Sequence, residues 1–89
     1  MTAKAVALSK ALAQAIALLR AHDWQGAHAI VQQHEDNPIA DHLHGIVHRI
    51  EGDLANSRYW YNKAGARFSA TRSIEAELSE IETSLNPTV

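Results

Sequence analysis

The chain has 89 residues, no cysteine and a formal net charge of −2 at pH 7, with the histidines counted as neutral. This length makes one small domain, residues 1–89, near the lower limit for folding without covalent or metal cross-links. Without cysteine the chain has neither disulfides nor thiolate metal sites, which suits a cytoplasmic location. The slightly acidic balance also argues against nucleic acid as a partner, because proteins that bind phosphate backbones carry a basic face.

Residues 3–21 predict a long helix. They are rich in alanine, leucine and lysine, which are strong helix formers. Apolar residues recur along one side of this segment at helical spacing: Leu8, Leu12, Ile16 and Leu19. Lys10 and Arg20 interrupt the apolar run, so we interpret it as a structural helix and not as a targeting peptide. It is also too polar for a membrane span of about 20 apolar residues, and no membrane association is expected.

Four shorter helices are expected after this segment, over about residues 24–33, 39–51, 54–64 and 71–85. Asp23 is placed to cap the first of them, and Asp36-Asn37-Pro38 forms a break before the second. Gly52-Asp53 ends the second and caps the third. The last has apolar residues on one side and glutamates on the others. Because no segment alternates apolar and polar residues as a strand does, the sequence predicts an all-α fold.

The chain also repeats itself. A shift of 30 residues superimposes three pairs of related residues: Asp23 and Asp53, Ala27 and Ser57, and Ile16 and Ile46. A fixed period of this size is typical of stacked helical hairpins. The expected architecture is therefore two antiparallel hairpins, over about residues 3–34 and 39–65, with a C-terminal capping helix over about 71–85.

The second hairpin carries a specific set of small residues and one aromatic residue: Gly45, Gly52-Asp53, Ser57, Tyr61 and Ala64. This pattern resembles the tetratricopeptide family, in which small side chains let two helices approach closely and the aromatic ring fills the space beside them. The resemblance covers residues 39–65 well and residues 9–38 loosely. In the first hairpin, Ala15 and His22 stand where the family has glycines, and the period is 30 residues instead of about 34.

The resemblance implies a non-catalytic module for protein–protein interaction. Tetratricopeptide proteins bind peptides or partner proteins in a groove lined by the first helices of successive hairpins. By position, the groove residues here are Leu12, Ile16 and Arg20 from the first hairpin and Ile39, His42, Ile46, Arg49 and Ile50 from the second. The partner is expected to be a protein or peptide, or a second copy of the chain that pairs through the alanine-rich first helix.

Trp60 is harder to place from the sequence. We favour packing under the fifth helix near Phe68, and the alternative is an exposed contact patch with Arg58, because aromatic and arginine side chains are enriched at the centres of interfaces. The basic residues around it have a simple interpretation as surface ion pairs with the acidic fifth helix: Arg58, Lys63, Arg67 and Arg72.

All six histidines lie between His22 and His48. On a helical wheel, one side of the third helix carries Asp41, His44, His48 and Glu51. His44 and His48 are four residues apart, a spacing at which two imidazoles can share a metal, with a carboxylate as a further ligand. No other segment offers an obvious third ligand. A plain polar face that also contributes to partner binding is therefore favoured, and a metal or small-ligand site is the alternative.

Catalysis is not expected. The chain has no phosphate-binding loop, no nucleophile elbow and no cysteine–histidine pair, and we predict neither catalytic residues nor a cofactor. A third hypothesis is pH sensing, because protonation of all six histidines would move the formal charge from −2 to +4.

Overall fold

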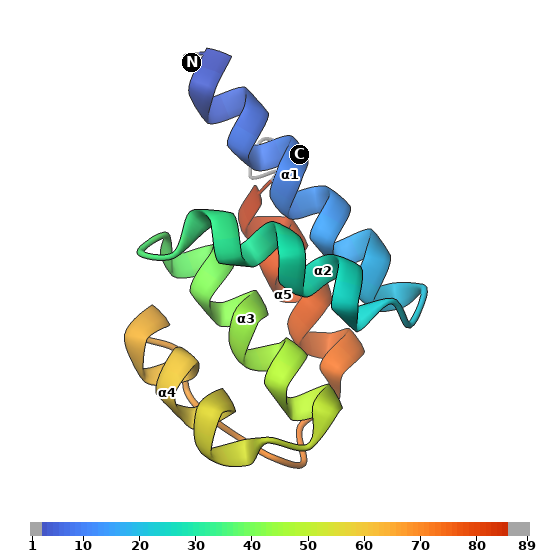
Figure 1. The fold of residues 1–89 in the computed structure, drawn as a ribbon, viewed down its shortest axis with the longest axis vertical. Helices are drawn as coiled ribbons and strands as arrows, with labels where there is room; N and C mark the ends of the chain where they lie inside the picture. Colours follow the sequence, from blue (N-terminus) through green and yellow to red (C-terminus); the bar gives the residue numbers. More distant parts are fainter. Residues whose placement is uncertain (1–2, 86–89) are drawn as a thin grey trace.

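The computed structural model describes residues 3–85, and over this range the chain is all-helical, which confirms the predicted fold class (Figure 1). The five α-helices within it are α1 (Ala3–Arg20), α2 (Trp24–Val31), α3 (Pro38–Glu51), α4 (Leu54–Ala64) and α5 (Ile74–Leu85), and one 3-10 turn, η1 (Gln32–His34), follows α2. None of the described helices combines the length and apolar character needed to cross a bilayer.

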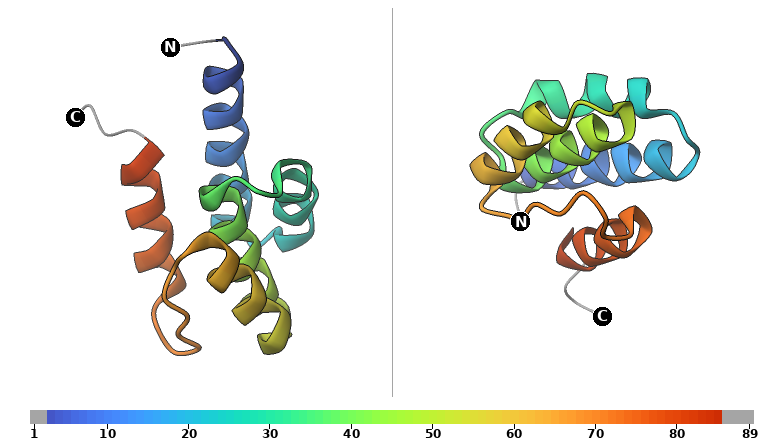
Figure 2. Two further views of the ribbon diagram at one scale, coloured as in Figure 1. Left: turned by 90° about the vertical axis from the view of Figure 1, so that its left-hand side faces the viewer. Right: turned by 90° about the horizontal axis from the view of Figure 1, so that it is seen from below.

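The helices pack as two hairpins and a covering helix. α1 and α2 form the first hairpin and α3 and α4 the second, and α2 also packs against α3. Figure 2 shows α5 on the opposite side of α1 and α3 from α2, and its contacts are with α1 and α3. α3 therefore lies in the middle of the molecule, with a neighbour on almost every side.

The turns of the two hairpins use the same local chemistry. The backbone N–H of Gly26 donates to Asp23 at 2.9 Å, and the backbone N–H of Asn56 donates to Asp53 at 3.2 Å, so an aspartate caps the second helix of each hairpin. Gly52 ends α3 with a φ of 91°, and His22 takes a similar left-handed conformation, with a φ of 65°, after α1. His22 thus performs the role of the turn glycine in the first hairpin, in a conformation that is strained for a residue with a side chain.

Close contact between α3 and α4 depends on two small side chains. The Ser57 hydroxyl donates to the carbonyl oxygen of Gly45 at 2.7 Å, and both residues are buried. A Cβ atom on Gly45 would lie 2.7 Å from Cε1 of Tyr61, well inside van der Waals contact. The predicted use of Gly45, Ser57 and Tyr61 is thus confirmed, while Ala64 lies half-buried at the end of α4.

α5 begins at Ile74, three residues later than the sequence predicts. The hydroxyl of Ser73 accepts from the backbone N–H of Ala76 at 3.1 Å and caps the helix. The preceding residues form a turn instead, because the hydroxyl of Ser69 accepts from the backbone N–H groups of Thr71 and Arg72. α2 likewise ends at Val31, and the predicted remainder of that helix is the turn η1.

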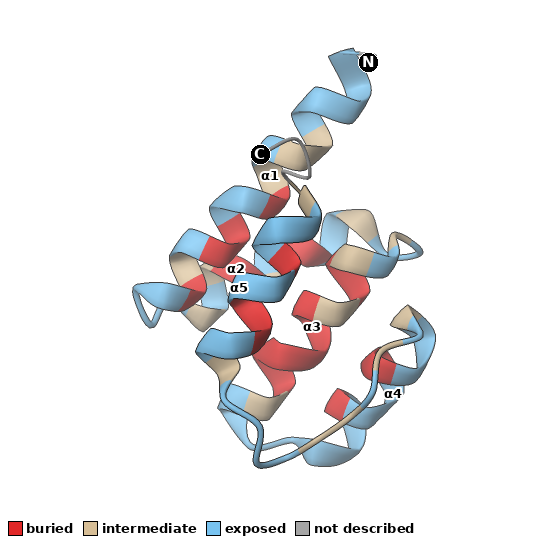
Figure 3. Ribbon diagram, turned by 180° about the vertical axis from the view of Figure 1, so that it is seen from behind, coloured by how far each residue is buried: buried red, intermediate tan, exposed pale blue. Residues whose placement is uncertain are grey.

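α3 carries most of the buried polar groups of the described residues. Figure 3 shows that much of this helix is buried. Three polar residues of α3 are almost completely buried, with exposed fractions of 2% for Asp41, 3% for His44 and 7% for His48. Charged and imidazole groups are seldom buried to this extent unless they are paired or bind a ligand. The burial of these three side chains therefore indicates that α3 carries a candidate functional site.

Candidate metal centre

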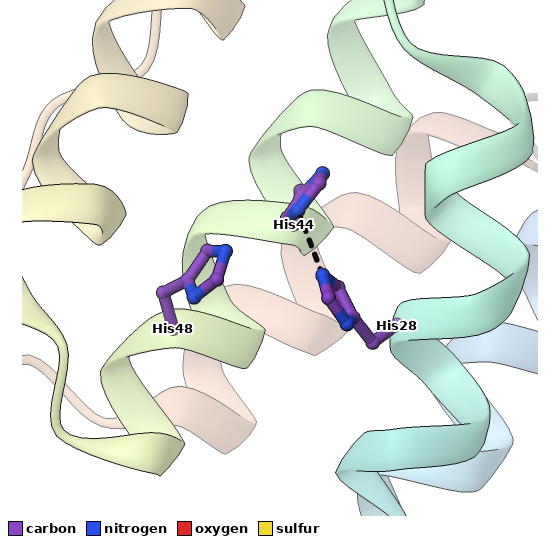
Figure 4. A group of neighbouring side chains, drawn as sticks. All are labelled: His28, His44 and His48. Carbon is purple, nitrogen blue, oxygen red and sulfur yellow. Dashed lines mark hydrogen bonds between the residues drawn. The ribbon is translucent and has the colours of Figure 1, made fainter.

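Three histidines from two helices meet at the interface of the hairpins. Figure 4 shows His28 reaching from α2 to His44 on α3, with His48 one turn further along α3. One ring nitrogen from each of the three lies within 4.8 Å of the other two, and the Nε2 atoms of His28 and His44 are 3.1 Å apart. We refer to these three residues as the histidine cluster.

The third histidine was missed by the sequence analysis, which found no ligand outside the third helix. His28 lies 16 residues before His44, and only the packing of α2 on α3 brings them together. The neighbouring Ala27 is completely buried and holds this face of α2 against the core. A histidine next to a small core residue was the available signal, but the sequence did not show which face of α3 it would meet.

The rings of the cluster are held by packing as well as by hydrogen bonding. The ring of His44 stacks on Trp60 of α4 at a centroid distance of 3.8 Å and an interplanar angle of 11°. The ring of His44 also stacks on the ring of His48, with the centroids 5.0 Å apart, and meets the ring of His28 edge-on at a centroid distance of 4.8 Å. An imidazole held by three rings has little freedom to rotate, which favours a fixed ligand geometry.

The favoured placement of Trp60 near Phe68 is therefore wrong. Phe68 packs against Tyr61 at 5.4 Å instead, and Trp60, which is 9% exposed, lies on the imidazole of His44. The reason is that adjacent residues on a helix point about 100° apart, and Tyr61 is the one turned toward the loop after α4. Trp60 is consequently part of the wall of the histidine cluster and not an exposed contact.

Burial opposes the protonation of two of the three rings, His44 and His28. Removal from water lowers the pKa of His44 to about 4, and the nearby charges of His28, His48 and Lys63 act in the same direction. Burial, and to a smaller extent the positive charge of a protonated His48, also lowers the pKa of His28. A neutral imidazole carries the lone pair that metal ligation requires, so the lowered pKa of His44 keeps this ring in the state that can bind a metal at pH 7.

The carboxylate of Glu51 fixes the tautomer of His48. Nδ1 of His48 lies 2.5 Å from Oε1 of Glu51, and since a carboxylate only accepts, Nδ1 is the protonated nitrogen. In the neutral form of such a ring, the other nitrogen, Nε2, carries the lone pair. A histidine oriented by a carboxylate in this way is a common arrangement in metal centres.

Asp41 belongs to the same region but does not join the histidine cluster as a ligand. It is almost completely buried, and burial raises the pKa of its carboxyl group. Among the described residues, two buried side-chain atoms have no hydrogen-bond partner, Oδ1 of Asp41 and Nδ1 of His44. Both belong to α3, and both are polar atoms that proteins rarely leave unpaired.

The residues predicted to line a peptide groove have a different environment. Ile46 is completely buried, and Arg49 is buried in an ion pair with Glu77 of α5. His42 contacts the same glutamate at 2.9 Å, and Arg20 of α1 pairs with two other glutamates of α5. α5 therefore lies over the predicted groove, and these side chains are engaged within the chain.

The outer groove candidates remain accessible. Ile39 is half-buried, whereas Ile50 is 38% exposed and the nearby Leu54 is 46% exposed. Ile50 also lines a hollow of about 410 Å³ between the hairpins and α5, together with apolar residues of which Leu19 and Ile74 are examples. The accessible apolar surface thus lies at the edge of α5 and not along a continuous groove.

Comparison with protein families, curated proteins and solved structures gives no match. The relationship to the tetratricopeptide family therefore stays a prediction that rests on the residues of the second hairpin.

Proposed function

We propose that the protein binds a divalent transition metal, with zinc as the principal candidate, through His28, His44 and His48. The observation that supports the proposal most directly is the convergence of three imidazoles from two helices, two of them buried and one half-buried. This site replaces the predicted set of ligands on α3 alone, since His28 joins the site and Asp41 does not.

The spacing of two of the three nitrogens fits a tetrahedral ion, and the three ligand nitrogens lie within 4.8 Å of one another. Zinc–nitrogen bonds of about 2.0–2.1 Å place two ligand atoms of a tetrahedron about 3.3 Å apart. The separation of 3.1 Å between Nε2 of His28 and Nε2 of His44 is close to this value. A set of imidazole ligands selects zinc, copper or nickel over magnesium or calcium, which prefer oxygen. Three protein ligands leave the fourth position of a tetrahedral ion for water or an external ligand.

The expected consequence of binding is a cross-link between the hairpins. His28 belongs to the first hairpin and His44 and His48 to the second, so one ion would hold α2 against α3. Binding of metal to the folded state alone stabilises that state by mass action. The protein is accordingly proposed to be a small metal-binding helical domain, and the predicted absence of catalysis and the cytoplasmic location belong to this proposal.

Metal content and titration test this function. Untagged, chelator-treated protein should bind one zinc ion per chain in isothermal titration calorimetry, and His28→Gln and His44→Gln should each remove most of the binding. His34→Gln is a matched control, because His34 lies outside the cluster on the turn η1 and should leave binding unchanged. Equal zinc binding by wild-type and His28→Gln protein would overturn the proposal.

A second candidate function is self-association through α1. The first half of this helix projects beyond the rest of the molecule in Figure 1, and its first buried residue is Leu12. Val6, on the projecting part, is 38% exposed. Burial of an exposed apolar side chain such as Val6 is favourable, so a second copy of the chain is a suitable neighbour for this part of α1.

Sedimentation equilibrium distinguishes this candidate. The wild-type protein should form a dimer at micromolar concentration, and Val6→Asp should shift the equilibrium toward monomer. Ala29→Asp, on an exposed position of α2, is the control and should have no such effect. A wild-type protein that stays monomeric at all accessible concentrations would exclude this mode of pairing.

A further inference from the structure

We infer that the projecting first half of α1 docks into the hollow between the hairpins and α5 of a second copy of the chain, and that two such contacts form a two-fold dimer. This inference rests on the proposed self-association through α1 and adds to it the surface that receives the helix. It is independent of the metal site, because none of the three cluster histidines lines the hollow.

The hollow is an apolar surface that the described residues leave open. It has a volume of about 410 Å³ and lies where the C-terminal ends of α1 and α3 meet the beginning of α5. Its walls include the buried Leu19 and Leu78 and the half-buried Trp24, and Ile50 at its edge is 38% exposed. Burial of exposed apolar surface is favourable, so the hollow suits an apolar segment.

The rim of the hollow has an excess of negative charge. Glu75, which lines the hollow, and Glu82 share a single cation, since Arg20 pairs with them at 3.0 and 2.9 Å. Two carboxylates thus face one guanidinium. Their side chains are 62% and 47% exposed, so a further cation has access to them. The best occupant of the hollow therefore combines apolar side chains with positive charge.

The first half of α1 has this combination. Val6 is 38% exposed, and the exposed Lys10 lies one helical turn further along the same side. Neither Lys4 nor Lys10 forms an ion pair with any residue that the structure describes. The charge and the apolar surface of this segment are thus complementary to those of the hollow.

The occupant must come from a second copy. The projecting half of α1 and the hollow lie at opposite ends of this helix, so α1 cannot fill the hollow of its own chain (Figure 1). A direct pairing of α1 with α1 would leave Lys10 without a counterion, because α1 contains no acidic residue. The carboxylates of α5 supply the missing charge. Since each copy carries one projecting half and one hollow, a two-fold arrangement makes both contacts and closes the assembly.

Charge reversal on each side of the contact tests the inference by sedimentation equilibrium. Lys10→Glu and Glu75→Lys should each raise the dissociation constant of the dimer about 10-fold, because a two-fold dimer contains the altered pair twice. Arg20 keeps its pair with Glu82 in Glu75→Lys, so the fold should be retained, and thermal unfolding verifies this.

Mixing the two charge-reversed chains is the decisive measurement. In the mixed dimer, one contact joins the two altered residues, which have opposite charges, and the other contact is that of the wild type. An equimolar mixture of Lys10→Glu and Glu75→Lys chains should therefore regain the wild-type dissociation constant. A mixture of Lys10→Glu with Glu80→Lys is the matched control and should not, because Glu80 pairs with Arg72 and does not line the hollow.

An apolar substitution tests the hollow itself. Ile50→Asp should weaken the dimer about as much as Val6→Asp, because the two side chains bury each other's surroundings in the docked state. Tyr59→Asp is the control for an exposed apolar side chain outside the hollow. Tyr59 is 57% exposed on α4, and its substitution should leave the dimer unchanged.

The outcomes separate this inference from the proposed self-association. If Val6→Asp weakens the dimer while Glu75→Lys and Ile50→Asp do not, α1 pairs with another surface, so the docking site is wrong and self-association through α1 stands. A mixture of charge-reversed chains that stays as weak as its components would also overturn the docking site. If the wild type remains monomeric, the proposed self-association is wrong, and the inference is overturned with it.

Discussion

At the scale of single residues, the buried polar groups of α3 explain most of what is unusual in this protein. His44 is enclosed by the rings of Trp60, His28 and His48, and its neutral form is strongly favoured. Buried imidazoles whose polar atoms lack partners lower the free energy of unfolding unless a ligand binds to them. This balance gives a direct test in the metal-free protein.

Stability of the metal-free protein should fall as the pH decreases through the interval between 6.5 and about 4. In this interval the unfolded chain binds a proton on His44 that the folded chain excludes, so protonation favours unfolding. The charged groups near the ring in the folded protein are His28, His48 and Lys63, and all three oppose its protonation. The loss attributable to His44 should be on the order of 1–3 kcal/mol at the acidic end.

Urea unfolding at several pH values checks this prediction. His44→Phe keeps the stacking on Trp60 but removes the titrating group, so its stability should depend less on pH. The raised pKa of Asp41 acts in the opposite sense and is present in both proteins, so the difference between them reports on His44. Parallel pH profiles for the two proteins would contradict the assignment.

Gly45 is the second residue whose effect is predictable. A Cβ atom at this position meets the ring of Tyr61, which is completely buried and has no space to move away. Gly45→Ala should destabilise the protein by about 1–3 kcal/mol through overpacking. Helix propensity alone predicts the opposite sign, a gain of about 1 kcal/mol. Thermal unfolding therefore decides between them, and a stabilised variant would show that α3 and α4 are not in close contact.

At the scale of elements, α5 is held by a buried network as well as by its apolar face. Glu77 is 1% exposed and accepts from the hydroxyl of Tyr61 at 2.9 Å, from Arg49 and from His42. Burial and this glutamate, which stabilises the protonated hydroxyl, raise the pKa of Tyr61 to about 12, against the effect of Arg49. One carboxylate thus links α5 to both α3 and α4.

Removal of this carboxylate should be costly. Glu77→Leu leaves Arg49, whose side chain is 6% exposed, without its charged partner, and should cost about 3–5 kcal/mol. Hydrogen exchange should show loss of protection throughout α5. Glu80→Leu is the matched control on the same helix, because its pair with Arg72 is exposed and worth less than about 1 kcal/mol. Similar effects of the two variants would disprove the special role of Glu77.

At the scale of the whole molecule, the proposed metal would connect the two hairpins that α5 also holds together. α5 contacts α1 and α3 on one side, and the histidine cluster lies between α2 and α3 on the other. In the metal-free protein the α2–α3 interface contains an unsatisfied nitrogen, which is a weak point in an otherwise close-packed core.

Zinc should therefore raise the stability of the whole domain. At a free zinc concentration 100 times the dissociation constant, the gain is about 2.7 kcal/mol. For a domain of this size the melting temperature should rise on the order of 10–20 °C. Scanning calorimetry with and without zinc provides the measurement, and His28→Gln should abolish the shift while His34→Gln keeps it. A shift of equal size in His28→Gln would locate the ion elsewhere.

The local features of this protein were determined by its sequence. Helical periodicity, the caps at Asp23 and Asp53 and the stop at Gly52 depend on residues within a few positions of one another, and they placed the ends of the helices to within three residues. The close contact of Gly45 with Tyr61 was also predictable, because the small and aromatic residues of the second hairpin resemble a pattern in which two helices approach closely. The spacing of His44 and His48 on one helix face is a property of the same kind.

Tertiary structure alone decided which faces of separate helices meet. His28 joined the cluster because α2 packs on α3, and the predicted groove residues Arg49 and Ile46 were covered because α5 lies over α1 and α3. The crossing of two helices depends on the summed packing of many side chains distant in sequence, and no short pattern encodes that sum. The histidine cluster and its unpaired atoms are products of this packing.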